Sequence, residues 1–93
     1  MMIGSCTIHL SIGGAFSLKE KRHVIKSIIN RIRARFNVSI AEVDAQDKWQ
    51  YAVLGICCVS NDSSHANSMI TKVINFIEND GRVVMMDYST EII

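Results

Sequence analysis

Apolar and polar residues alternate along the first segment of the chain, residues 2–12. One face carries Met2, Gly4, Cys6, Ile8, Leu10 and Ile12, and the other carries Ile3, Ser5, Thr7, His9 and Ser11. A period of two residues with one polar face predicts a half-buried β-strand. Gly13 and Gly14 then break the pattern, so we expect a turn.

The pattern changes to a helical period over residues 17–36. Ser17 followed by Glu20 has the spacing of a capping box, which predicts the start of a helix. Asn37 is a plausible stop. The apolar residues recur at helical spacing and form one stripe, which consists of Leu18, Ile25, Ile28, Ile29, Ile32 and Phe36.

The remaining segments predict two strands, a helix and a last strand. Residues 38–43 are rich in β-branched residues, 44–48 form a polar turn, and 49–59 are apolar on both faces, which is typical of a central strand. Several possible N-caps in residues 61–64 precede a second amphipathic helix. Its stripe consists of Ala66, Met69, Ile70, Val73, Ile74 and Ile77. Asp80 and Gly81 end it, and residues 83–93 form the last strand.

The order βαββαβ predicts a ferredoxin-like sandwich of the α+β class, in which residues 1–93 form a single domain. We expect a four-stranded antiparallel sheet with two helices on one face. The first and third strands should be central, and the second and fourth should lie at the edges. Many unrelated functions use this fold, so the fold alone names none.

The charge distribution is uneven, although the net charge of the chain is only +1. Residues 19–35 hold seven of the ten basic residues and a single acidic one, Glu20, so this segment carries +6 and the remainder carries −5. On a helical wheel, four of these cations fall within about 60° of one another. They form a basic ridge, defined here as Lys19, Arg22, Lys26 and Arg33.

The basic ridge extends roughly 21 Å along the helix axis and is long enough to follow several phosphates of a nucleic acid. The alternative is that it is only a solvated face, whose long side chains cover apolar edges with their stems. Clustering of a single charge sign favours the functional interpretation, because solubility alone would mix the signs.

The composition gives little sign of catalysis, cofactors or membranes. No apolar run approaches the length of a membrane span, and the N-terminus does not resemble a signal peptide. Three cysteines, Cys6, Cys57 and Cys58, argue against a secreted disulfide framework, so we expect a cytoplasmic location. Cys57 and Cys58 should point to opposite faces of a strand, and no histidine has metal-ligand spacing. We expect no metal, no cofactor, no small-molecule substrate and no enzymatic activity.

Three further features leave alternatives open. Gly13 and Gly14 before a helix start could cradle a phosphate, although turn geometry explains both residues and no arginine follows in residues 13–17. Trp49 and Tyr51 share a face of the third strand and are hairpin or core residues, or they stack on a base or a partner. The acidic residues Glu42, Asp44 and Asp47 are turn residues or contact a partner.

Two segments form a recognisable pattern, residues 17–22 (SLKEKR) and residues 35–43 (RFNVSIAEV), and the pattern continues through residues 47–50 and 59–62. In these segments the chain resembles the YlxP-like family of small bacterial proteins. The resemblance implies a ferredoxin-like domain and a link to RNA or ribosomes, because genes of the family tend to lie among translation and ribosome-maturation genes. The family has no established catalytic residues. Lys19, Lys21 and Arg22 fall within its most recognisable motif, and Glu42 and Asp47 also lie in the matching segments.

The sequence therefore predicts a small non-enzymatic accessory protein, associated with RNA or ribosomes. Phosphates would bind the helix over residues 17–36 through Lys19, Lys21, Arg22, Lys26 and Arg33. The alternative is a protein-interaction or homodimerisation module. It would use the open face of the sheet, and its contact residues would be Glu42, Asp44, Asp47, Trp49 and Tyr51. A phosphate-handling enzyme is a minor alternative.

Overall fold

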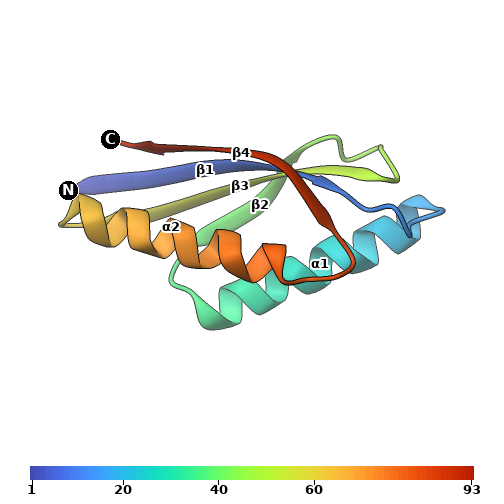
Figure 1. Ribbon diagram of the computed structural model, residues 1–93, viewed down its shortest axis with the longest axis horizontal. Coiled ribbons are helices and arrows are strands. Elements are labelled where there is room, and N and C mark those ends of the chain that lie inside the picture. Colours follow the sequence, from blue (N-terminus) through green and yellow to red (C-terminus); the bar gives the residue numbers. More distant parts are fainter.

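The order of elements is the one that the hydrophobic pattern predicts. The computed structural model describes residues 1–93 (Figure 1). It contains β1 (Met2–Ser11), α1 (Leu18–Arg35), β2 (Ser39–Asp44), β3 (Tyr51–Ser60), α2 (Ser63–Glu78) and β4 (Val84–Ile92). The clearest differences concern the β2–β3 hairpin, where Asp44 belongs to β2 and Trp49 precedes β3.

The four strands form one antiparallel sheet in the order β2-β3-β1-β4. This order confirms the predicted central positions of β1 and β3. The two strands pair along their whole length, from Met2 opposite Ser60 to Ser11 opposite Tyr51. Both helices lie against the same face of the sheet, and the other face is bare (Figure 1). This arrangement is the predicted ferredoxin-like sandwich.

The core lies between the sheet and the helices. Ile8 of β1 and Leu54 of β3 face each other across the ladder, and both are fully buried. The predicted stripe of α2 supplies Ile70, Val73 and Ile77, which are also buried. Because burial of each such side chain contributes roughly 1.5–3 kcal/mol, this layer stabilises the whole domain.

The start of α1 forms as the capping pattern predicts. The Ser17 hydroxyl accepts a hydrogen bond from the Glu20 amide at 3.1 Å. The Glu20 carboxylate reaches back to accept from the amide of Phe16, one residue before the cap. These two bonds satisfy amides that an isolated helix start leaves unpaired.

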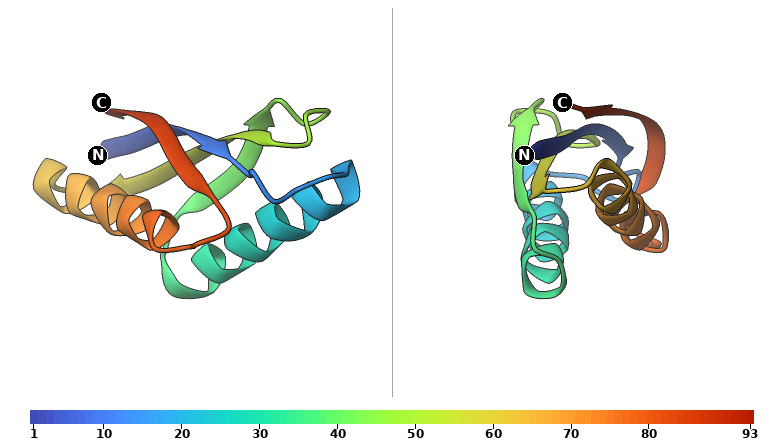
Figure 2. Two further views of the ribbon diagram at one scale, coloured as in Figure 1. Left: turned by 45° about the vertical axis from the view of Figure 1, so that its right-hand side comes forward. Right: turned by 90° about the vertical axis from the view of Figure 1, so that its left-hand side faces the viewer.

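Each edge of the sheet has a different helix beneath it. Viewed along the sheet, α1 lies beneath β2 and α2 lies on the side of β4 (Figure 2). The side chains of α1 that face β2 therefore share one side of the molecule with the β2–β3 hairpin. Neither helix has the combination of length and apolar character that a bilayer crossing requires.

Candidate nucleic-acid interface

The basic ridge lies on the flank of α1 that faces β2. Arg22, Lys26 and Arg33 line a shallow groove of about 410 Å³ between the helix and β2. Lys19 stands at the N-terminal end of the same flank and is exposed, as are the other three side chains. The structure thus brings these four predicted residues to one accessible surface.

Three of the four ridge cations have no partner within the chain. Lys19, Arg22 and Lys26 form no ion pair, and their side chains donate no hydrogen bond. Arg33 differs, because its Nη2 donates to the backbone oxygen of Ile40 in β2 at 3.0 Å. Arg33 therefore ties α1 to β2, whereas the other three charges remain free for a ligand.

The predicted role of Lys21 as an exposed phosphate contact is wrong. This predicted phosphate contact is fully buried, in the first turns of α1 beside the core residue Ile25. Its Nζ lies 2.6 Å from Glu42 Oε2 and donates to the backbone oxygen of Ala45 at 2.7 Å. Helical spacing places Lys21 within the apolar stripe, so it cannot share the exposed flank with Lys19 and Arg22.

Glu42 is likewise not the exposed partner contact that the sequence suggests. It lies opposite Leu54 in the β2–β3 ladder and faces α1, and its side chain is only 17% exposed. Glu42 Oε2 accepts no hydrogen bond from any group other than its ionic partner. A charge buried in this way is tolerated only when it is paired, so Lys21 and Glu42 depend on each other.

The buried ion pair also holds the β2–β3 hairpin. Ala45 adopts a φ of 59°, a left-handed conformation that is unfavourable for a residue with a side chain. Lys21 holds its backbone oxygen, and the Asp44 carboxylate accepts from its amide at 2.8 Å. Asp44 therefore has a turn role, as one of its two interpretations expected.

The other predicted partner contacts do not form one surface. Asp47 is exposed in the hairpin, and Trp49 is 55% exposed there rather than being part of β3. Tyr51 is half-buried on the bare face of the sheet, where its hydroxyl is hydrogen-bonded to Nδ1 of His9. The expectation that Trp49 and Tyr51 share a strand face is thus wrong, because the strand begins only at Tyr51.

A second basic groove lies on the opposite flank of α1 and was missed by the sequence analysis. Arg31, Arg35 and Arg82 line a cavity of about 640 Å³ between the end of α1 and the loop after α2. The spacing of Arg31 and Arg35 places them on one flank, but nothing in the sequence indicates that Arg82 joins them.

The arginines of this second groove are largely engaged. Arg82 donates to both carboxylate oxygens of Asp80, at 2.9 and 2.7 Å, and to the Ser27 hydroxyl at 3.2 Å. Hydrogen bonding to Arg82 holds the pKa of Asp80 below its usual range, and the same contact raises the pKa of Arg82. Arg35 lies over the ring of Phe76, with its guanidinium carbon 5.1 Å from the centroid.

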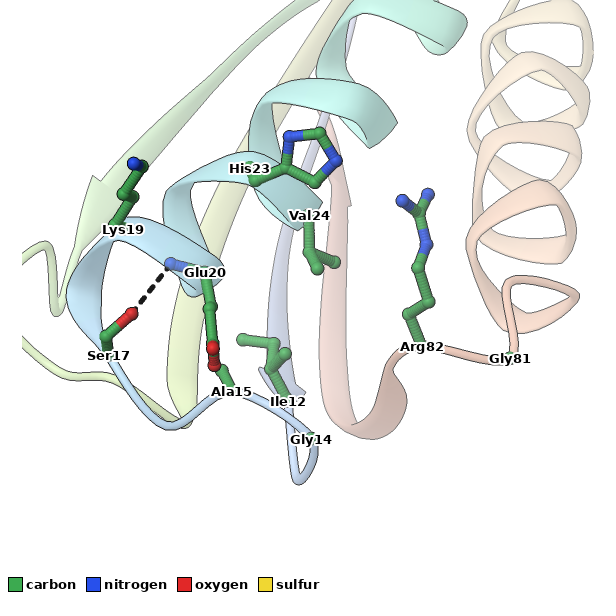
Figure 3. Close-up of a pocket in the computed structure, with 10 residues that line it drawn as sticks. All are labelled: Ile12, Gly14, Ala15, Ser17, Lys19, Glu20, His23, Val24, Gly81 and Arg82. Carbon is green, nitrogen blue, oxygen red and sulfur yellow. Dashed lines mark hydrogen bonds between the residues drawn. The ribbon is translucent and has the colours of Figure 1, made fainter.

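A cavity of about 710 Å³ lies beside the Gly13–Gly14 turn, between the start of α1 and the loop that carries Arg82 (Figure 3). Gly14, His23 and Arg82 line it, above an apolar floor that includes Ile12. The Glu20 carboxylate accepts a hydrogen bond from the amide of Phe16, so this amide is not free to bind a phosphate. A negative side chain thus sits where a phosphate cradle would need free amides, and this weakens the phosphate-handling alternative.

The cysteines offer little nucleophilic chemistry. Cys6 and Cys58 are buried and free, and burial raises the pKa of the Cys6 thiol. Cys58 lies opposite Gly4 and Cys57 opposite Ser5, so the two adjacent thiols point to opposite faces, as predicted. No group of three or more His, Cys, Asp and Glu side chains converges as metal ligands would.

Comparison with known proteins places the chain in a family. Residues 3–90 match the family model described as Protein of unknown function (DUF503). The chain is also 42% identical over 77 residues to Uncharacterized protein YlxP of Bacillus subtilis, a match that covers 83% of this chain and 84% of that protein. The chain belongs to the DUF503 family. The resemblance to YlxP-like proteins is thereby confirmed.

One solved structure supports the fold. A de novo designed protein with a ferredoxin fold superposes with a TM-score of 0.57 at 15% identity, over 100% of this chain and 84% of that one. A dimeric ferredoxin-like protein from an uncultured marine organism gives a TM-score of 0.44 at 10% identity, over 100% of this chain and 94% of that one. At these identities the likeness of the designed protein concerns the fold alone.

The buried ion pair connects the two segments that carry the family resemblance. Lys21 lies in residues 17–22 and Glu42 lies in residues 35–43, and the two side chains meet between α1 and β2. The buried ion pair therefore gives these two motif residues a structural role. The exposed cations Lys19 and Arg22 have no such structural role.

Proposed function

We propose that this DUF503 protein is a non-enzymatic accessory protein that binds RNA through the phosphate backbone. The basic ridge of α1 is the binding surface, and it works without Lys21. The observation that carries the proposal is that Lys19, Arg22 and Lys26 are exposed on one flank and have no acidic partner. Solvated helix faces usually mix charge signs, and this face does not.

The electrostatics of the surrounding surface favour the ridge over the second groove. Arg82 is neutralised by Asp80, and Arg35 packs on Phe76, so that groove presents less free charge. Acidic residues outside α1 outnumber basic ones by eight to three, so the rest of the molecule repels an anionic ligand. RNA is therefore oriented toward α1 on approach, and shape rather than base contacts supplies any specificity.

A ribosome or a ribosomal precursor is the RNA target that we propose, in a cytoplasmic setting. The support is the implied link of YlxP-like proteins to translation. Fractionation of a lysate tests this part separately. The protein should co-migrate with ribosomal particles, and treatment with nuclease should release it. If the protein migrates only in its free form, the ribosome is not its target. RNA binding as such is tested by the next experiment.

The decisive experiment measures affinity for a single-stranded RNA at several salt concentrations. Three or four phosphate contacts predict a log–log slope of about −2 to −3, since each contact contributes about −0.7 on single strands. Arg22→Gln with Lys26→Gln should flatten the slope by about 1.4. The matched control, Lys48→Gln with Lys72→Gln, removes the same charge from exposed residues outside α1 and should leave the slope unchanged.

Two results would overturn the proposal. Equal slopes for both double variants would show that binding follows net charge rather than the ridge. A slope that flattens only in Arg31→Gln with Arg35→Gln would move the site to the second groove.

A further inference from the structure

The outer edge of β4 is long, unpaired and unusually apolar. β4 pairs only with β1, so one side of this nine-residue strand faces solvent. Val84, Met86 and Tyr88 are exposed by 66, 61 and 50%, and Ile93 directly after the strand by 67%. Exposed apolar side chains concentrated on one edge mark a contact surface, because isolated edges of this kind aggregate.

Tyr88 shows most clearly that a neighbour is missing. It lies opposite Ile8, which is fully buried on the helix-covered face, so Tyr88 belongs to the same face. It is nevertheless half exposed, because α2 does not cover the outer row of the sheet. A groove of about 470 Å³ remains there, lined by Glu78 of α2 and by residues 83–88.

The direction of the backbone groups shows where a further strand would attach. Ile3 and Ile93 exchange both of their backbone hydrogen bonds at 2.9 Å. In an antiparallel ladder the hydrogen-bonding residues alternate, so Tyr88, Thr90 and Ile92 direct their amides and carbonyls to the open edge. Within the chain the Tyr88 amide finds only the side chain of its neighbour Asp87, at 2.9 Å.

The open edge has few of the devices that keep edges monomeric. β4 contains no lysine, and the chain contains no proline. A bulge at Met86 and two carboxylates, Asp87 and Glu91, are the devices present. These carboxylates disfavour some registers of pairing between β4 and an added strand, but not every register.

We propose that the β4 edge binds a second copy of this chain, so that two β4 strands pair antiparallel around a two-fold axis at Tyr88. Like charges directly opposite each other are unfavourable, which decides the register. An axis at Asp87 would place two Asp87 side chains together, and an axis at Ser89 would place Asp87 against Glu91.

An axis at Tyr88 avoids both conflicts and brings the exposed apolar residues of each copy beside the other copy. Regular pairing is centred on residues 87–89, because the bulge at Met86 shifts the register and the faces of the residues before it. Met86 and Val84 then lie beside the end of the second copy's strand without forming regular cross-strand pairs. An axis at Thr90 also avoids the conflicts, but it leaves Val84 and Met86 without a neighbour. The charge pattern of β4 is therefore compatible with itself in the register that also covers the exposed apolar residues, and such self-complementarity is a property that a C2 dimer requires.

The resulting dimer has a continuous eight-stranded sheet with all four helices on one face. The two Tyr88 rings meet beneath the join, next to the ends of the two α2 helices. Each basic ridge stays on the far side of its own copy, beside β2, so the dimer does not depend on the proposed RNA function and does not obstruct it.

Cross-linking tests the register. In a Cys57→Ser background, Tyr88→Cys should form a covalent dimer under mild oxidation. Opposed residues in a hydrogen-bonded antiparallel pair have Cα atoms about 5.5 Å apart, within the range of a disulfide. Glu91→Cys is the matched control on the same strand. Its two copies would lie about 20 Å apart and should not cross-link.

Sedimentation from low micromolar to several hundred micromolar protein tests the assembly without a cysteine substitution. We expect a reversible dimer, and Thr90→Lys should weaken it at least tenfold while the circular dichroism spectrum stays unchanged. A monomer over the whole range would overturn the proposal. A dimer that cross-links equally at both positions, or that persists in Thr90→Lys and cross-links through Val59→Cys on the bare face, would also overturn it.

Discussion

The two edges of the sheet are protected in different ways. The β2 edge is short, bulged near Val43 and covered by α1, whose Arg33 binds a β2 carbonyl and whose Lys21 is buried against Glu42. The β4 edge is longer and has apolar side chains and open backbone groups. Contacts of charged side chains within the chain protect the β2 edge, whereas the β4 edge is left open for the second copy that we propose.

The largest expected effect concerns the protected edge. Lys21→Met should lower the free energy of unfolding by about 3–5 kcal/mol, because it leaves Glu42 buried without a partner. The combined change Lys21→Met with Glu42→Leu should recover most of this loss, since an apolar pair needs no compensation. Urea unfolding of the two variants measures both. A loss of less than about 1 kcal/mol in the free energy of unfolding of Lys21→Met would mean that water hydrates the Glu42 carboxylate in place of Lys21.

A smaller effect is expected at the other link between α1 and β2. Arg33→Gln removes a charged hydrogen bond to Ile40 and should cost about 1 kcal/mol, because the side chain is exposed. It should also speed hydrogen exchange in β2 while leaving β4 unchanged. Arg31→Gln, two residues away and without this bond, is the matched control. Equal exchange in both variants would show that Arg33 does not secure the edge.

On the side of β4, the ion pair in the α2–β4 loop should make stability depend on acid pH. The pKa of Asp80 is lowered in the folded chain, mainly by its hydrogen bonds to Arg82. Its contribution is therefore present above the unfolded pKa of about 3.9 and is lost as pH falls through the folded value. Asp80→Asn should cost about 0.5–1 kcal/mol at neutral pH. Melting temperatures should converge with wild type once the pH falls below the pKa of Asp80 in the folded chain, and a constant difference would exclude this cause.

The smallest effect on folding is expected at the open edge itself. Thr90→Lys should change the free energy of unfolding of the monomer by less than about 0.5 kcal/mol, because Thr90 is exposed and its side chain makes only a weak hydrogen bond, to the Cys6 sulfur at 3.6 Å. The measurement is urea unfolding at low protein concentration, where mass action does not favour the dimer. A large loss of stability there would show that the β4 edge is already part of the monomer's packing. In that case the contrast between the two edges would disappear.

The sequence by itself determined the order of elements, the central strands and the concentration of cations on α1. Period-two alternation, helical stripes and a capping pair are local signals, and they are readable because core burial imposes those periods. The same signals could not place Lys21. Its position in the stripe of Ile25, Ile28 and Ile32 conflicts with its charge, and only the nearby Glu42 resolves that conflict.

Only the tertiary structure decided which charges are free and which edge is open. Lys19 and Lys21 are two residues apart, yet one is exposed and the other is buried, because the sheet packs against one side of the helix. Arg82 joins Arg31 through a loop more than forty residues away, and Tyr88 is left half exposed because α2 stops short of the outer row. Such facts depend on contacts between segments that are distant in the chain, and local periodicity does not report those contacts.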